Sequence, residues 1–166
     1  MTEYRVLSSE DATKNDVDIF VELVRSGGTV DKHFVRQELK RPGAKIVFAE
    51  SDGQAIGVVA LKIPSDQYRS GLESGAKARH PLSHEDYPYE LGYVSVSPDH
   101  GGRGIGRKLV EIVLELAEGK GIFATTGNSA MKDGILQHLG FYQTGNVWKN
   151  DADETIQLLV RSAQKK

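Results

Sequence analysis

The chain has 166 residues, enough for one compact domain with a buried core, and its hydrophobic and charged fractions of 39% and 27% are ordinary for a globular protein. The formal net charge of −2 gives no overall attraction to nucleic acid or to an anionic membrane. The absence of cysteine excludes disulfides, thiolate zinc sites and a cysteine nucleophile. No segment approaches the roughly 18 apolar residues of a membrane span. We expect a cytoplasmic protein without a signal peptide that binds neither nucleic acid nor membranes.

The first part of the chain alternates strand and helix patterns. The predicted elements are a strand at 4–8, a helix at 15–26 that ends at Gly27-Gly28, a helix that follows the N-cap Asp31 and ends at Pro42-Gly43, and a hairpin of strands at 45–50 and 54–63. In the second helix, the spacing of Phe34, Val35 and Leu39 predicts that all three face the core.

A polar segment without periodicity follows at 65–88, and we expect it to be a long loop on the substrate side. It contains His80 and His84, but Pro81 argues against a helix that would align them, and no third ligand is evident. We therefore expect no metal site. A mobile loop without function is the alternative for this segment.

The remaining elements complete a mixed sheet. They are a strand at 89–96, a helix at 105–116, a strand at 122–126, a helix at 129–138, two strands at 141–149 and 155–161, and a frayed tail at 162–166. The strand–helix–strand order of 89–126 implies a parallel strand pair, and the flanking hairpins imply antiparallel strands. The prediction is one α/β domain, 1–166, with a mostly antiparallel sheet, a central parallel pair and helices on both faces.

The segment from Val96 to Lys108 carries the strongest signal of chemistry. Four glycines lie between a strand and a helix, where the backbone can approach a ligand and the first N–H groups of the helix attract an anion. Arg103, Arg107 and Lys108 crowd the same helix start, although cations there oppose the helix dipole. A bound polyanion would account for them, whereas the plainer alternative is a flexible turn with solvated cations. The spacing matches neither a P-loop nor a dinucleotide-binding fingerprint.

This strand, Val96-x-Pro98, and the x-x-Gly-x-Gly turn at the helix start resemble the acetyl-CoA signature of the GNAT family of N-acetyltransferases. The order of elements is similar to that family from Tyr4 to Val160, as are Asn128 and Leu139-Gly140-Phe141. The resemblance implies acetyl-CoA as co-substrate, with the parallel strands opening to admit its pantetheine arm. It departs at Gly101, where the family usually has Gln or Arg.

The resemblance also implies roles for individual residues. The Val94 N–H would polarise the thioester carbonyl, and Asn128 would touch the cofactor near its reactive end. The backbone at Val94, Ser95 and Val96 would pair with the pantetheine arm. The pyrophosphate would lie against Gly101, Gly102, Arg103, Gly104, Ile105 and Gly106, with Arg107 and Lys108 close by.

Proton transfer is less well defined. Family members with a glutamate base carry it at the position of Glu90, which could otherwise be a solvated strand-end residue or an ion-pair partner. Many members carry a tyrosine acid at the position of Leu136, so the donor to the leaving thiolate is open. The other candidates are Tyr142, Tyr93 and His138.

The resulting hypothesis is direct transfer of acetyl from acetyl-CoA to the primary amine of a small molecule or amino acid. The alternatives are a sensor module that binds acyl-CoA without transfer and an acetyltransferase acting on a protein N-terminus or lysine. A homodimer is compatible with these features.

Overall fold

The computed structural model describes residues 1–26 and 31–164. Seven strands form a sheet in the hydrogen-bonded order β1-β2-β3-β4-β5-β7-β6, with β4 and β5 parallel. The pairs β1–β2, β2–β3, β5–β7 and β6–β7 are antiparallel, which confirms the predicted mixed sheet. The chain divides into two compact units, 1–63 with 91–116 and 64–90 with 117–166. The single domain stays a prediction. Within the described residues, no helix is long and apolar enough to cross a bilayer.

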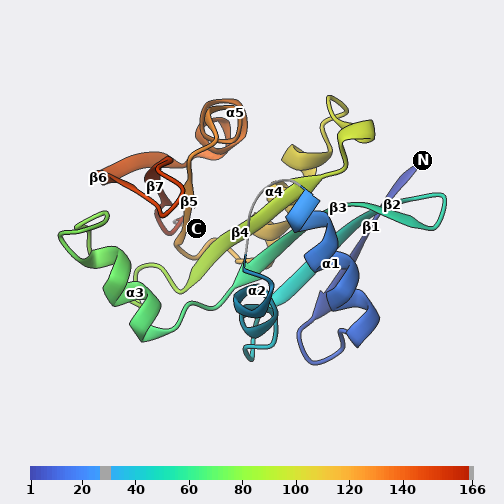
Figure 1. The fold of residues 1–166 in the computed structure, drawn as a ribbon, viewed down its shortest axis with the longest axis horizontal. Helices are drawn as coiled ribbons and strands as arrows, with labels where there is room; N and C mark the ends of the chain where they lie inside the picture. The colour runs from blue at the N-terminus through green and yellow to red at the C-terminus, as the bar shows by residue number, and fades with distance from the viewer. Residues whose placement is uncertain (27–30, 165–166) are drawn as a thin grey trace. The chain divides into compact units, whose positions relative to one another are not determined.

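The first unit contains most of the elements that precede the glycine turn (Figure 1). They are β1 (Thr2–Ser8), α1 (Lys14–Ser26), α2 (Lys32–Leu39), β2 (Lys45–Ser51), β3 (Gln54–Lys62), the larger part of β4 (Tyr89–Val96), η1 (Pro98–His100) and α4 (Ile105–Leu116). Thr13 and Asp16 cap α1 reciprocally, each side chain accepting the other's backbone N–H, at 3.1 and 2.9 Å. Asp31 accepts from the backbone N–H groups of His33 and Phe34, as the predicted N-cap requires.

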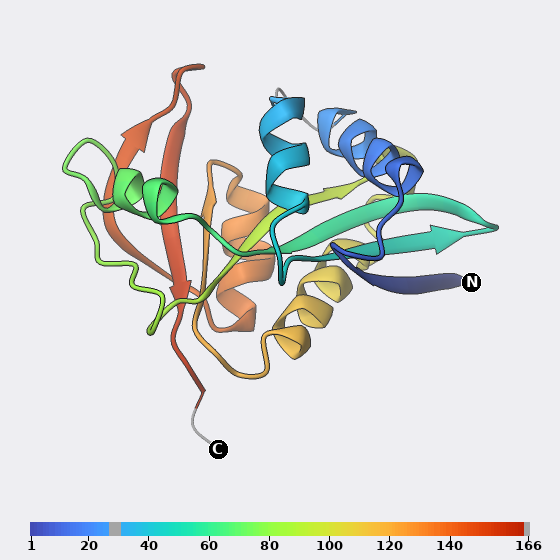
Figure 2. The same ribbon diagram turned by 90° about the horizontal axis from the view of Figure 1, so that it is seen from below.

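The core of the first unit lies on both sides of its strands. Figure 2 shows α1 and α2 on one face of β2 and β3, and α4 on the opposite face. The helices α1 and α2 pack against alternate strand residues, including Phe48 and Val58. On the other face a Cβ at Gly57 would lie 3.3 Å from the side chains of Ile105 and Leu109, so α4 approaches the sheet closely. The inward placement of Phe34 is wrong, since its side chain is 42% exposed. Gly27-Gly28 lie outside the described residues.

The second unit holds the remaining elements. They are α3 (Asp66–Glu73), the first two residues of β4, β5 (Ile122–Thr126), α5 (Ser129–Met131), the π-helical turn η2 (Lys132–Leu136), the 3₁₀ turn η3 (Gln137–Leu139), β6 (Tyr142–Lys149) and β7 (Thr155–Arg161). The predicted helix at 129–138 therefore changes winding twice before Gly140 ends it with φ 94°. In the tail expected to be frayed, the Gln164 N–H donates to the Gly119 carbonyl at 2.7 Å, and residues 165–166 lie outside the described ranges.

The segment 65–88 is not the uninterrupted loop that its composition predicts. The side chain of Ser65 accepts from the Tyr68 N–H at 3.1 Å and caps α3, which lies beside β6 and β7 in Figure 2. Leu72, Ala78 and Leu82 of this segment form an apolar cluster with residues of β5 and β7, and Trp148 packs against it. Trp148 is partly buried at the edge of this cluster.

Candidate active site

The strand β4 carries a backbone irregularity at Tyr93, whose φ is 55°. A residue with a side chain adopts this left-handed conformation at a cost of about 1–3 kcal/mol, so its surroundings must hold it there. Such an irregularity interrupts the alternation of a strand and redirects its backbone groups. Val94, whose N–H is the predicted thioester contact, follows directly. Beyond it the Ser95 hydroxyl donates to the Leu23 carbonyl of α1 at 2.9 Å.

The glycine turn connects this strand to α4. The Ser97 N–H donates to the Ile56 carbonyl at 2.7 Å, and η1 then turns the chain toward the glycines. Gly102 and Gly104 have φ values of 76° and 77°, and a Cβ at either would meet nothing within 4 Å. Glycine is therefore required by backbone conformation rather than by lack of space. The turn is exposed, and the buried Ile105 fixes the start of α4, whose first N–H groups lack intrahelical acceptors.

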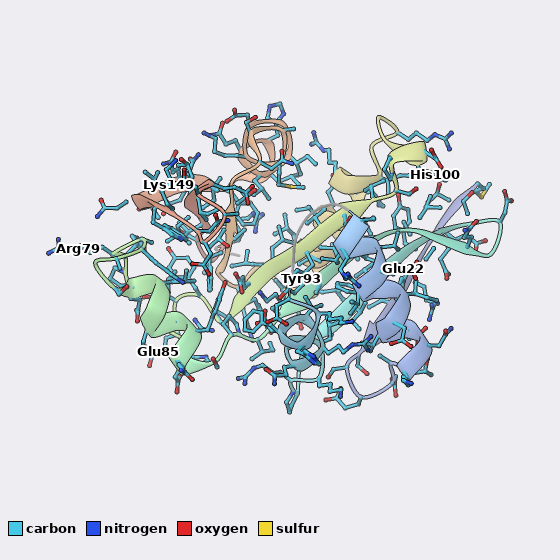
Figure 3. The ribbon with its side chains drawn as sticks, in the orientation of Figure 1. Glu22, Arg79, Glu85, Tyr93, His100 and Lys149 are labelled. Carbon is cyan, nitrogen blue, oxygen red and sulfur yellow. The ribbon has the colours of Figure 1, made fainter. Side chains whose placement is uncertain are left out.

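The electrostatics of the turn favour an anion. The first turn of α4 contains no acidic residue, and Arg103, Arg107 and Lys108 are exposed around it. Arg107 lies 3.8 Å from Glu111 one helical turn later, an exposed pair of little energetic weight. The cationic side chains and the helix N-terminus therefore act in the same direction on a bound phosphate. Figure 3 labels His100, which precedes the turn.

Glu90 belongs to the second unit and is 2% exposed. The Tyr68 hydroxyl of α3 donates to Glu90 Oε2 at 2.8 Å. The next residue, Arg69, is also buried, and its guanidinium donates to carbonyl oxygens along the segment, among them Leu82 at 2.9 Å and Tyr87 at 2.7 Å. The alternative of a strand-end glutamate facing water is thereby wrong, because burial and a tyrosine partner define the surroundings of this carboxyl group.

The other positions of the second unit that the sequence singled out are a helix cap, a buried leucine and two exposed side chains. Asn128 is the N-cap of α5, and its Oδ1 accepts from the Met131 N–H at 3.0 Å. Leu136 is 1% exposed within η2. Tyr142 is 50% exposed and its hydroxyl lies 3.2 Å from that of Ser162, while His138 is exposed near the end of η3. The structure thus places Val94 to Lys108 in the first unit, and Glu90 and Asn128 in the second.

Sequence reasoning missed a buried polar cluster in the first unit. Glu38 of α2 lies 2.7 Å from Lys62 Nζ and accepts from the Tyr93 hydroxyl at 2.7 Å. The sequence contained one indication that Glu38 is buried, because Glu38 shares the helical spacing of the inward residues Val35 and Leu39. Tyr68 and Arg69 were missed as well, since nothing in the polar segment marked them as buried.

The residues at the turn fit the pyrophosphate of coenzyme A. Two left-handed glycines, an exposed helix N-terminus and three cations supply backbone donors and positive charge at one place. Among residues 1–26 and 31–164, no three or more His, Asp or Glu side chains are grouped so as to hold a metal ion. His84 instead lies 2.9 Å from Asp66.

Comparison with known proteins gives consistent results. A rat (Rattus norvegicus) protein, N-acetyltransferase family 8 member 2, is 33% identical over 118 residues, which are 68% of this chain and 45% of that protein. The chain thus spans less than half the length of that relative. One similar solved structure is an acyl-CoA N-acyltransferase from Pseudomonas aeruginosa, with 17% identity and a TM-score of 0.72, covering 97% of this chain and 99% of the other. Another is a GNAT family acetyltransferase from Elizabethkingia anophelis with acetyl-CoA bound, with 17% identity and a TM-score of 0.63, covering 97% of each chain.

These structures are similar in fold over nearly the whole chain. The model of the acetyltransferase (GNAT) family matches residues 15–141, which include β4, the glycine turn and α4. The chain belongs to the acetyltransferase (GNAT) family.

Proposed function

We propose that the protein is an N-acetyltransferase that transfers acetyl directly from acetyl-CoA to the primary amine of a small molecule or amino acid. The observation that carries the proposal is the turn before α4, in which Gly102 and Gly104 adopt left-handed conformations beside Arg103, Arg107 and Lys108. Acetyl-CoA would supply the activated acetyl group as a thioester. The residues of this chain bind the donor, orient it and remove a proton from the acceptor.

The first unit would bind the donor. Backbone N–H groups from Gly101 to Gly106 would hold the pyrophosphate, and the backbone of Val94 to Val96 would align the pantetheine arm. The Val94 N–H would face the oxygen on which negative charge develops. A donor aimed in this way stabilises the transition state more than the ground state, and removing one such donor typically costs about 10²–10³ in kcat. The family resemblance also implies that Asn128 contacts the donor near its reactive end.

Glu90 would accept the proton of the amine. An ordinary lysine-type amine has a pKa of about 10.4, so at neutral pH it must lose a proton before it can attack a thioester. The buried carboxyl group of Glu90 is held on β4, four residues before Val94, and by the hydroxyl of Tyr68. These contacts support a fixed base that acts directly or through one water.

A sensor that binds acyl-CoA without transfer is the second candidate. The buried Leu136, at the position of the usual tyrosine acid, favours it. Two measurements test the candidates, and the second of them separates the two. In a thermal-shift assay, acetyl-CoA at 100 times its dissociation constant should add about 2.7 kcal/mol of stability in either case. Only the enzyme should then release free coenzyme A thiol when supplied with a panel of primary amines, peptides with free N-termini included.

The substitution Glu90→Gln tests the base. The amide keeps the size of the side chain and an oxygen to accept from Tyr68, but it cannot take a proton. We expect kcat with the best amine to fall about 10²-fold or more while the Kd for acetyl-CoA stays within twofold. Glu115→Gln, an exposed change on α4, is the matched control and should leave both values unchanged. An unaltered rate for Glu90→Gln at neutral pH would remove Glu90 from the mechanism.

A further inference from the structure

The left-handed residue of β4 is held from outside the strand. Tyr93 has a φ of 55°, and its hydroxyl donates to Glu38 Oε1 at 2.7 Å. Its ring meets Phe20 of α1 edge-on, at 6.1 Å between centroids and 88° between planes. Figure 3 labels Tyr93 beside the helices α1 and α2 from which these contacts come.

Glu38 is itself part of a buried ion pair. Its Oε1 lies 2.7 Å from Lys62 Nζ, and the two side chains are 6% and 5% exposed. Lys62 Nζ also lies 4.7 Å from the centroid of the Tyr93 ring. Burying two charges is costly, and apolar residues of similar size often stabilise a fold as well or better. A contribution to stability therefore does not account for the pair, whereas its hydrogen bond to Tyr93 gives it a definite partner at the irregular point of the strand.

The lysine also fits closely against the backbone of β4. A Cβ built at Gly92 would collide with Cδ of Lys62, so the lysine stem crosses the strand at that residue. Gly92 and Tyr93 are thus covered by Lys62, and Ser95 is anchored through its hydroxyl to the Leu23 carbonyl at 2.9 Å. The residues on both sides of Val94 are therefore fixed by side-chain contacts to other elements of the same unit.

We propose that Glu38, with Lys62 as its counter-ion, is a positioning residue. It holds Tyr93 in its left-handed conformation and thereby fixes the direction of the Val94 N–H. The proposal rests on the proposed function in taking Val94 as the donor to the developing oxyanion. Glu38 acts through Tyr93 and touches neither substrate. Oxyanion stabilisation depends on alignment within fractions of an ångström. A loosened backbone at Tyr93 should therefore slow the chemical step more than it weakens binding of the donor.

Tyr93→Phe removes the hydroxyl and keeps the ring. We expect kcat to fall about tenfold while the KM for acetyl-CoA changes less than threefold. Glu38→Gln should retain more activity than Glu38→Ala, because its amide oxygen can still accept from Tyr93. Tyr4→Phe in β1 is the matched control and should leave kcat unchanged. If Tyr93→Phe lowers only the melting temperature, or if Glu38→Ala and Glu38→Gln are equally active, the positioning role is wrong.

A second measurement separates this inference from the proposed function. In ¹H–¹⁵N spectra of the free protein, Tyr93→Phe should shift the Val94 and Ser95 amide resonances and speed their hydrogen exchange, while Tyr4→Phe should not. If the wild type is inactive but Tyr93→Phe shifts these resonances, the transfer reaction is refuted and the positioning of the N–H is retained. An active wild type with unshifted Val94 resonances in Tyr93→Phe would refute the positioning and retain the transfer.

Discussion

Replacing Arg69 by methionine should destabilise the second unit more than any surface change in the same segment. Arg69 is 4% exposed, and its guanidinium donates to the carbonyl oxygens of Leu82 at 2.9 Å, Tyr87 at 2.7 Å, Pro88 at 3.1 Å and Pro64 at 3.4 Å. These four acceptors lie before and after α3, so one side chain holds both ends of the segment. Methionine fills part of the same volume but donates to none of them.

The expected loss in the free energy of unfolding follows from those contacts. A buried acceptor left without a donor costs about 1–3 kcal/mol, and water can reach the acceptors that are only partly buried. A hydrogen bond from a charged donor contributes about 1.5–3 kcal/mol, and we expect Arg69→Met to lose about 3 kcal/mol in all because methionine restores some apolar contact. Against a total stability of about 5–15 kcal/mol, the variant should still fold.

Urea unfolding followed by the fluorescence of Trp148 measures this directly, because the single tryptophan packs against the cluster that α3 helps to form. Arg79→Met, an exposed arginine in the same segment labelled in Figure 3, is the matched control and should stay within about 0.5 kcal/mol of wild type. A loss below about 1 kcal/mol for Arg69→Met would contradict the claim that the guanidinium holds the segment in place.

Two further predictions concern the first unit. Gly104→Ala should raise the Kd for acetyl-CoA, measured by calorimetry, about tenfold, because alanine is strained at φ 77°. Gly101→Ala is the control, since Gly101 has a φ of −66°, and it should change the Kd less than twofold. Equal effects would contradict a conformational requirement for glycine. Asp16→Asn should destabilise at pH 7 but not near pH 2. Burial acts to raise the pKa of Asp16, but hydrogen bonds from Thr13 and Arg5 outweigh it and lower the pKa. The stabilisation is therefore present above the unfolded pKa of about 3.9 and is lost as pH falls through the lower folded value. Urea unfolding at the two pH values checks it, and an equal loss at both would refute it.

The parts of the fold that sequence predicted well are those encoded by neighbouring residues. The hairpin turn needs only Asp52 and Gly53, which adopt φ values of 52° and 76°, and the N-cap of α2 needs only Asp31 and the two N–H groups that follow. The glycine turn was identified for the same reason, since its left-handed positions and the helix start lie within a few residues of each other.

The parts that sequence missed depend on partners far along the chain. Arg69 occupies an inward position of α3 because carbonyl oxygens up to 19 residues away accept from it, and a charge at a core position conceals the amphipathic pattern. Glu38 presents the same difficulty, because its partner Tyr93 is 55 residues away. The left-handed conformation of Tyr93 also has no local signal, since nothing near it in sequence favours a positive φ.

Leu136 weighs less against catalysis than its position first indicates. It is buried in η2, so this site offers no proton to a leaving group. The need for that proton depends on the pKa of the group that leaves, which for a thiol is about 8.5, compared with about 10.4 for the attacking amine. A thiolate can therefore depart without a dedicated acid under conditions in which the amine still cannot attack without a base. For the proposed transfer, a base at Glu90 would therefore matter more than a tyrosine at position 136. Release of coenzyme A thiol, rather than the identity of residue 136, decides between transfer and sensing.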